Sequence, residues 1–354
     1  MKKLFQTIFI DGLSGMATGL FATLILGTIL QQIGTYMPNI VGAYFIAFAG
    51  IAKVLTGAGI GMGVASKLKC SPLISVSAAV AGMVGAYAGK LNISTNALVS
   101  GSGILLEGAG EPLGAYVAAM IAIGAGKCVA GKIKGMDILL VPFFSILAGS
   151  AAGLWVGPPI SDFMNYLGGI INWATDQQPL IMGIVVSVLM GMALTLPISS
   201  AAIGISLNLS GLAAGAATIG CCCNMIGFAV ASYKENGIGG LFAQGFGTSM
   251  LQVPNIIRRP LIWIPAILSS AILGPIGTVL LGMKNNAIGS GMGTSGLVGV
   301  IQTFYTMSPS GDSIVVLIKI MIMHFVLPAM IAISVSSYMR KKGLIKDGDM
   351  KLEV

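Results

Sequence analysis

Charged side chains are scarce in this sequence. Lys, Arg, Asp and Glu together make up 8% of the 354 residues, and hydrophobic residues make up 55%. A soluble globular domain carries roughly a quarter charged residues, so this composition excludes a large water-facing surface and a soluble catalytic domain. We therefore predict an all-α integral membrane protein. Because one helical crossing needs about 20 apolar residues, the chain has room for about ten transmembrane helices.

The sequence also lacks the motifs of metal and nucleotide sites. It holds 5 cysteines and 1 histidine, and the consecutive Cys221, Cys222 and Cys223 cannot all point at one metal from a regular helix. No zinc motif, P-loop or nucleophile elbow is present. We therefore expect no catalytic residue, no metal and no cofactor, and the chain alone is not expected to be an enzyme.

The net charge of +8 has a topological explanation. Basic residues collect in short loops and at the tails, as the positive-inside rule requires, so nucleic acid is not an expected partner. We expect a multi-pass protein with both termini in the cytoplasm and the loop 158–178 outside. Breaks between apolar runs predict spans at 13–33, 40–62, 72–88, 112–126, 137–157, 179–196, 198–216, 237–251, 261–282 and 314–338.

A weak internal repeat runs through the sequence at an offset of 123 residues. Ser77 maps to Ser200, and Pro142 maps to Pro265. Transporters often contain such repeats. We predict one polytopic domain, 1–354, with repeats at 51–173 and 174–296 flanked by the first and last helices. Chance similarity in so biased a composition is the alternative.

Three stretches rich in glycine and small polar residues interrupt the apolar pattern, at 92–112, 215–235 and 285–296. We predict that they are broken or re-entrant segments. Irregular backbone at membrane depth must be buried in protein or line a cavity, so these stretches are expected to line a binding site. The alternative is tight helix packing through pairs of small residues, such as Gly149 and Gly153.

Two carboxylates, Glu107 and Glu111, lie in the first of these stretches. Ionisable groups in membrane segments are costly and usually functional. Four residues apart, the two share a face if the segment is helical. They are predicted to accept hydrogen bonds from sugar hydroxyls, to hold a cation or to carry a proton. The alternative places them at the outer rim in water, because Pro112 begins a new helix.

Neutral polar residues complete the predicted substrate site: Asn208, Asn224, Thr294 and Ser295. Their amide and hydroxyl groups are donors and acceptors suited to hydroxyl-rich solutes. His324 and Lys53 are predicted proton or ion sites, because both lie within apolar runs. The alternative for His324 is a packing residue with a hydrogen bond.

Three strings carry a family resemblance. LTLPISSAAIGISLNLSGLAAGAATIG (194–220), SYKENGIGGLFAQGFGTSMLQVPNI (232–256) and GSGMGTSGLVG (289–299) resemble the phosphotransferase system (PTS) enzyme IIC-like family that includes the perfringolysin O regulator. The resemblance implies a bacterial cell (inner) membrane protein, a sugar permease subunit (EIIC) that works with a separate PTS IIB protein at the cytoplasmic face, and a homodimer.

The resemblance leaves part of the family pattern unmatched. The sequence contains no hydrophilic IIA or IIB domain and no Gly-Ile-Thr-Glu sugar motif of the glucose type. Phosphoryl transfer is therefore expected to need separate proteins. The leading hypothesis is a permease for a sugar or similar polar solute. The alternatives are a membrane-embedded regulator or sensor that transports nothing, and a cation-coupled secondary carrier.

Overall fold

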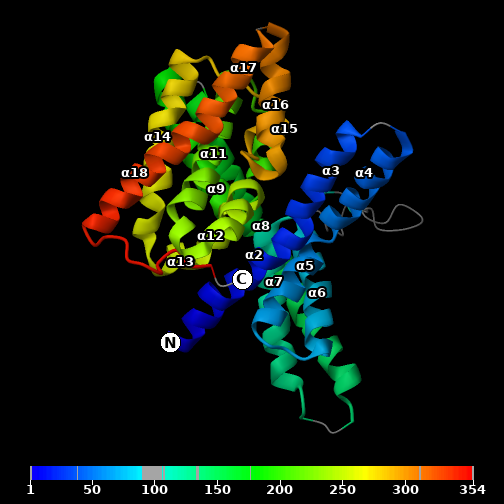
Figure 1. Ribbon diagram of the computed structural model, residues 1–354. Coiled ribbons are helices and arrows are strands. Elements are labelled where there is room, and N and C mark those ends of the chain that lie inside the picture. Colours follow the sequence, from blue (N-terminus) through cyan, green and yellow to red (C-terminus); the bar gives the residue numbers. More distant parts are fainter. Residues whose placement is uncertain are drawn as a thin grey trace. The chain divides into compact units, whose positions relative to one another are not determined.

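The computed structural model describes residues 2–37, 39–89, 106, 108–132, 135–175, 177–310 and 312–352. In these residues the chain is helical and forms no strand (Figure 1), which confirms the all-α membrane class. Six helices are long and apolar enough to cross a membrane, and one further pair bends by 57° at Leu55. The chain divides into unit 1, Met1–Met164, and unit 2, Asn165–Glu353. The repeats at 51–173 and 174–296 stay a prediction.

Unit 1 begins with a long helical run and continues as a bundle. Its elements are α1 (Lys2–Phe5), η1 (Gln6–Gly12), α2 (Leu13–Leu20), η2 (Phe21–Ile25), α3 (Leu26–Tyr36), α4 (Asn39–Val54), α5 (Thr56–Lys67), α6 (Pro72–Tyr87), α7 (Pro112–Val129) and the first part of α8 (Asp137–Thr175). Proline opens α6 and α7, where its fixed φ suits the first helical turn and its missing N–H loses no helical bond.

Small residues hold the helices of unit 1 together. A Cβ built at Gly149 would meet the carbonyl oxygen of Ala118 at 2.7 Å, and one at Gly153 would meet Cα of Gly85 at 2.9 Å. Backbones approach this closely only where side chains are absent. The packing explanation of Gly149 and Gly153 is therefore confirmed.

Unit 2 combines long helices with many short ones. It holds the rest of α8, then α9 (Pro179–Thr195), α10 (Ser200–Ser206), α11 (Gly211–Ala231), α12 (Tyr233–Phe242), η4 (Ala243–Gly247), η5 (Ser249–Gln252), α13 (Val253–Arg258), η6 (Pro260–Trp263), α14 (Ile264–Pro275), η7 (Ile276–Leu280), α15 (Ala287–Ser290), η8 (Ser295–Leu297), α16 (Val298–Met307), η9 (Ser308–Ser310), α17 (Ser313–Ile320), η10 (Met321–Val326) and α18 (Leu327–Lys341).

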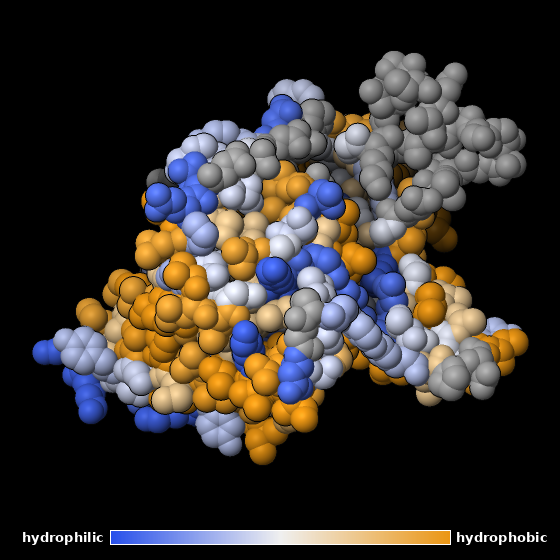
Figure 2. Space-filling model, turned by 90° about the horizontal axis from the view of Figure 1, so that it is seen from above, coloured by the Kyte–Doolittle hydropathy of each residue, from blue (hydrophilic) through white to orange (hydrophobic). Residues whose placement is uncertain are grey.

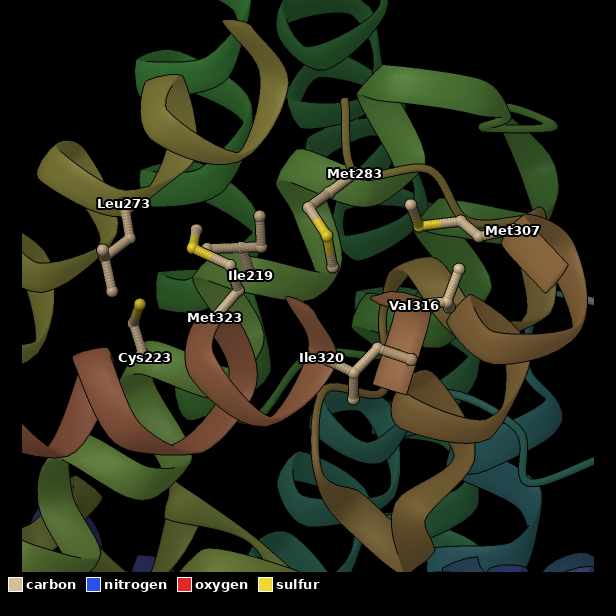
Figure 3. Packing of buried hydrophobic residues seen from close by; sticks show 8 residues of the cluster. All are labelled: Ile219, Cys223, Leu273, Met283, Met307, Val316, Ile320 and Met323. Carbon is tan, nitrogen blue, oxygen red and sulfur yellow. The ribbon is translucent and has the colours of Figure 1, made fainter. Parts of the chain in front are cut away.

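Helix α11 is the centre of unit 2, and nearly all of its residues are buried. It packs against α9, α14 and α18. Figure 3 shows its side chains Ile219 and Cys223 facing Leu273 of α14 and Met323 of η10 in one apolar cluster. On the α9 side, Gly220 presents bare backbone to the carbonyl of Ser187. Short side chains therefore let three helices contact α11 directly.

The structure corrects the prediction of an interrupted segment at 215–235. Residues 211–231 form the single helix α11. Its glycine, alanine and cysteine residues serve close helix packing on all sides and do not break the helix. By contrast, the predicted irregular stretch 285–296 is confirmed, because Gly293 and Gly296 have positive φ and the stretch holds only the four-residue helix α15 and the start of the short 3-10 helix η8. Most of the stretch 92–112 lies outside the described residues.

Two predicted spans and one predicted loop are also wrong. The span 198–216 is broken between α10 and α11, where Asn208 and Gly211 have positive φ. The span 237–251 is divided among short helices with buried polar residues such as Gln244. Residues 158–175 of the predicted outer loop continue α8. Proline inside a helix usually kinks or ends it, which is why the sequence predicted a loop, but Pro158 and Pro159 lie within α8.

The outer surface of the described helices is strongly apolar. Broad areas of hydrophobic side chains are visible in Figure 2, and large residues such as Ile138, Trp155 and Ile314 are 75%, 84% and 67% exposed. A soluble protein rarely exposes apolar patches of this extent. The surface is the one expected of a multi-pass protein whose solvent is lipid.

The contact between Gly220 and α9 generates a stability prediction. Gly220→Ala forces a methyl group against the Ser187 carbonyl, and such overpacking costs about 1–3 kcal/mol of unfolding free energy. Gly124→Ala is the matched control, because a Cβ at this helical position of α7 meets open space and alanine favours helix by about 0.5–1 kcal/mol. Thermal unfolding of the detergent-purified variants is the measurement. Equal midpoints for both variants would contradict the close packing at Gly220.

Candidate functional site

The amide of Asn224 is the centre of a buried polar site in unit 2. Asn224 lies on α11 and is 0% exposed. Its Oδ1 accepts hydrogen bonds from Thr195 Oγ1 at 3.1 Å and from Trp263 Nε1 at 2.8 Å. Its Nδ2 lies 3.2 Å from the Gly220 carbonyl oxygen and 3.3 Å from Ser270 Oγ. Every hydrogen-bonding position of this amide therefore has a partner.

A second hydroxyl extends the network. Ser249 Oγ lies 2.8 Å from Thr195 Oγ1. The residues Thr195, Asn224, Ser249, Trp263 and Ser270, called here the Asn224 cluster, come from α9, α11, η5, η6 and α14. None of them is ionisable near neutral pH. The cluster offers neutral donors and acceptors that at present bond to one another.

The loop Gly291–Gly296 packs against α11. Gly293 has φ 52° and approaches Cys221 and Cys222 so closely that a Cβ there would lie 2.7 Å from Cys221 Cβ. Only glycine suits both conditions. The approach brings Thr294 Oγ1 within 3.5 Å of Met225 Sδ and lets it donate to the Gly245 carbonyl. Thr294 therefore contacts Met225, the residue that follows Asn224 on α11.

A second buried amide, that of Asn285, fixes the irregular stretch that carries this loop. Its Nδ2 lies 2.7 Å from Thr218 Oγ1, 2.9 Å from Thr303 Oγ1 and 3.0 Å from the Gly299 carbonyl oxygen. Its backbone N–H donates to Gly211 at 3.1 Å, where α11 begins. These bonds satisfy backbone and side-chain groups that would otherwise be unpaired next to the broken helix.

The predicted carboxylate Glu111 lies in unit 1, immediately before α7. Its backbone N–H donates to the Ala86 carbonyl at 2.7 Å, and nearby the Tyr87 hydroxyl donates to the Gly108 carbonyl at 2.6 Å. These bonds hold the loop against the end of α6. The side chain is mostly buried, and among the described residues its Oε1 has no hydrogen-bond partner. Burial raises the pKa of Glu111 to about 7, so the carboxyl is partly protonated near neutral pH.

The remaining predicted residues lie in several places. Glu107 is outside the described residues. Ser295, next to Thr294, is buried, and its Oγ has no hydrogen-bond partner in the described parts of the chain. Asn208 is exposed and has φ 47° at the end of α10, a conformation that asparagine tolerates well. No hydrogen bond described for unit 2 joins it to the Asn224 cluster.

The two predicted ion-site residues are in different units. Lys53 in unit 1 donates to Gln31 Oε1, so this cation has a neutral partner on α3. His324 in unit 2 is 1% exposed and lies in the π-helical turn η10. Its Nδ1 has no hydrogen-bond partner among the described residues. The alternative prediction was a packing residue held by a hydrogen bond, and no such bond forms at Nδ1 of His324 among the described residues.

Four members of the Asn224 cluster were absent from the sequence predictions: Thr195, Ser249, Trp263 and Ser270. They are far apart in sequence, and each looks like an isolated polar residue in an apolar run. One signal was available. The string GTSMLQVPN holds four polar residues and no charge, which is unusual for a span that faces lipid and indicates protein-buried side chains.

Comparison with known families decides the identity of the chain. The family described as "Phosphotransferase system, EIIC" matches residues 10–352. The chain belongs to this family. No curated protein matches the sequence. Membership in the EIIC family makes the chain a membrane component of the phosphotransferase system, which works with other proteins of that system on a sugar-like substrate.

The raised pKa of Glu111 generates a pH prediction. Its folded pKa of about 7 exceeds the ordinary 4.5, so the folded state binds the proton more tightly than the unfolded state. The associated stability is full below the unfolded pKa and is lost as the pH rises through the folded pKa. We expect the thermal unfolding midpoint of the wild type to decrease as the pH rises from about 5 to about 8. Glu111→Gln should show a smaller decrease over the same range, because its side chain does not titrate.

Thermal unfolding across this pH range checks the prediction. Asp137→Asn serves as the control, because it removes a carboxylate that is half-exposed at the start of α8. Oδ1 of Asp137 accepts an exposed hydrogen bond from the Gly131 N–H. A pH profile in which Glu111→Gln and the wild type run parallel would show that the Glu111 carboxyl is not buried.

Proposed function

We propose that the chain is the permease subunit of a sugar phosphotransferase system, and that the Asn224 cluster of unit 2 binds the solute during translocation. The observation that supports this is the gathering of four neutral polar side chains, from four other elements, around the fully buried amide of Asn224. Thr195, Trp263 and Ser270 bond to the amide directly, and Ser249 bonds to Thr195. A structural role alone would need fewer elements, because one or two bonds satisfy an isolated buried asparagine.

The chemistry of the cluster suits a sugar. Each sugar hydroxyl both donates and accepts, and the amide of Asn224 with the hydroxyls of Thr195, Ser249 and Ser270 provides both functions. The Trp263 indole adds a flat apolar face beside a donor. Small-molecule sites typically combine apolar walls with a few placed polar groups of this kind. Thr294 and Ser295 on the adjacent loop are proposed to extend the site.

The cluster as it stands is closed. Asn224 and Ser249 are 0% exposed, and their polar groups bond within the cluster. A solute must therefore exchange its hydroxyls for these internal bonds, which requires the surrounding segments to move apart. This is the behaviour that alternating access demands of a site near the middle of a membrane protein.

The proposed orientation rests on basic residues at one end of each unit. In unit 1, Lys127 at the end of α7 donates to the Leu68 carbonyl at 3.4 Å, which places it beside Lys67 and Lys69. In unit 2, Arg259 and Arg340 both pair with residues 347–349. Positive charge favours the cytoplasm. We propose that both ends face the cytoplasm of a bacterium, with both termini there.

The proposed partners follow from this orientation. A separate IIB protein is proposed to dock on the cytoplasmic ends and to phosphorylate the sugar, since the Asn224 cluster holds no charged group. A homodimer remains part of the proposal. Glu107, Glu111 and Asn208 remain predicted solute contacts, and Lys53 and His324 remain predicted proton sites.

Loss of the Thr195 hydroxyl tests the proposed sugar site. Thr195 Oγ1 bonds to Asn224 and Ser249 in addition to its own helix carbonyl, Gly191. Thr28→Val is the matched control, because buried Thr28 Oγ1 bonds only to the Leu24 carbonyl of its own helix. Binding to the folded state raises the unfolding midpoint by mass action, so a screen against sugars, polyols and sugar acids identifies the solute.

We expect one class of sugar to raise the midpoint of the wild type and of Thr28→Val. Thr195→Val should bind it about tenfold more weakly, since one hydrogen bond contributes about 0.5–1.5 kcal/mol and 1.4 kcal/mol is tenfold in affinity. Unchanged sugar affinity in Thr195→Val would show that the sugar does not bind at the Asn224 cluster. If no compound raises the unfolding midpoint, the result favours the sensor hypothesis.

A further inference from the structure

The segment that follows α18 folds back onto the end of unit 2. Residues 343–352 are called here the tail. The carbonyl oxygen of Met350 accepts hydrogen bonds from Asn236 Nδ2 at 2.8 Å and from Gln252 Nε2 at 3.0 Å. The N–H of Leu352 donates to Asn236 Oδ1 at 2.8 Å. The tail is thus bound through its backbone.

Buried amide side chains form a chain of hydrogen bonds that begins at the tail. Asn255 Nδ2 donates to the Lys351 carbonyl at 2.9 Å and to Gln252 Oε1 at 2.8 Å. Gln252 donates to Gln244 Oε1 at 2.9 Å, and Gln244 donates to Ser232 Oγ at 2.9 Å. All these side chains are buried. Without the tail, Gln252 and Asn255 would each lose one of their two acceptors.

Apolar contacts also hold the tail against unit 2. Met350 is 0% exposed and Ile345 is 2% exposed, and both belong to a cluster with Phe228, Ile262 and Met339.

Three ion pairs lie in the same regions, and two of them involve the tail. Arg340 Nη2 lies 2.7 Å from Glu235 Oε1, with both side chains mostly buried, and Arg340 Nη1 lies 3.0 Å from Asp347 Oδ1 of the tail. Arg259 Nε lies 3.6 Å from Asp349 Oδ1, but Arg259 is largely exposed, so that pair adds little. Burial of Met350 and the amide bonds therefore dominate the docking.

One short stretch of chain joins the tail to the Asn224 cluster. Within residues 249–263, Ser249 and Trp263 bond to the cluster, whereas Gln252 and Asn255 bond to the tail. The Trp263 ring also packs against the apolar cluster that contains Met350. The tail and the Asn224 cluster therefore hold the same stretch from two sides.

We propose that the tail is a latch that keeps the stretch 249–263 against α11 and so holds the Asn224 cluster closed. Release of the tail frees Ser249 and Trp263 from the cluster and opens it. The meaning of this opening for transport rests on the proposed function, but the coupling between tail and Trp263 is a property of the fold and can be measured without any solute.

Tryptophan fluorescence can report the latch directly. The chain has 3 tryptophans, and Trp155 and Trp173 are exposed at 84% and 56%. In a Trp155→Phe, Trp173→Phe background, the emission and acrylamide quenching come from Trp263 alone. Met350→Asp introduces a charge into the apolar cluster and releases the tail. Lys342→Gln is the control, because it changes the net charge by the same amount at an exposed position just before the tail.

Two measurements are made on each detergent-purified protein. Trypsin cleavage after Lys346 and Lys351 reports release of the tail, and acrylamide quenching reports exposure of Trp263. We expect Met350→Asp to be cleaved faster, with red-shifted and more strongly quenched emission, while Lys342→Gln behaves like the background protein. Faster cleavage with unchanged Trp263 emission and quenching would overturn the latch.

A milder variant covers the case in which Met350→Asp does not fold, as judged by size-exclusion chromatography. Asn236→Asp keeps the shape and the bond from Leu352 but loses the donor to Met350, and it should give the same two changes to a smaller degree. Failure of the proposed function has a different signature. If release of the tail exposes Trp263 but no sugar binds any variant, the latch stands and the solute site does not.

Discussion

The direct contact of helix backbones at α11 is the constraint on which the structure of unit 2 depends. Gly220 of α11 meets the carbonyl of Ser187 on α9, and Gly274 of α14 meets the carbonyl of Gly183 on α9. In lipid, helices gain little from hydrophobic burial against one another, so close packing and interhelical hydrogen bonds must hold them. The same short distance lets the Asn224 amide reach partners on both neighbouring helices. Larger residues at these glycines would separate the helices and the polar groups together.

Much of the fold and some of the candidate site could be predicted from the sequence. Scarcity of charge gave the membrane class, and glycines with polar neighbours marked the irregular stretch 285–296 correctly. The same signal failed at 215–235, because glycines that permit a break and glycines that permit close packing have the same composition. Asn224 and Thr294 were identified as polar residues in apolar surroundings. Ser249 and Trp263 were missed, since their approach to Asn224 depends on how distant segments fold.

The Asn224 cluster of unit 2 and Glu111 of unit 1 limit buried charge by different means. The cluster uses amides and hydroxyls, which carry no charge. Unit 1 uses the carboxyl of Glu111, whose pKa is raised to about 7 by burial. A charged group away from water costs far more than a neutral one, so a buried acid binds a proton to lower that cost. Protonation therefore gives the Glu111 carboxyl a hydrogen-bond donor that a carboxylate lacks.

As the proposed solute site, the closed Asn224 cluster sets the energetic terms on which a sugar can enter. The internal bonds of Asn224 are satisfied, so a sugar gains only the difference between its own hydrogen bonds and those it replaces, each about 0.5–1.5 kcal/mol. A tightly closed cluster would exclude the solute, and a loose one would leave buried polar groups unpaired. The stretch 249–263 contacts both regions, because Ser249 and Trp263 bond to the cluster while Gln252 and Asn255 bond to the tail. In the proposed latch, opening depends on contacts outside the cluster, and those contacts can change without altering the groups proposed to recognise the solute.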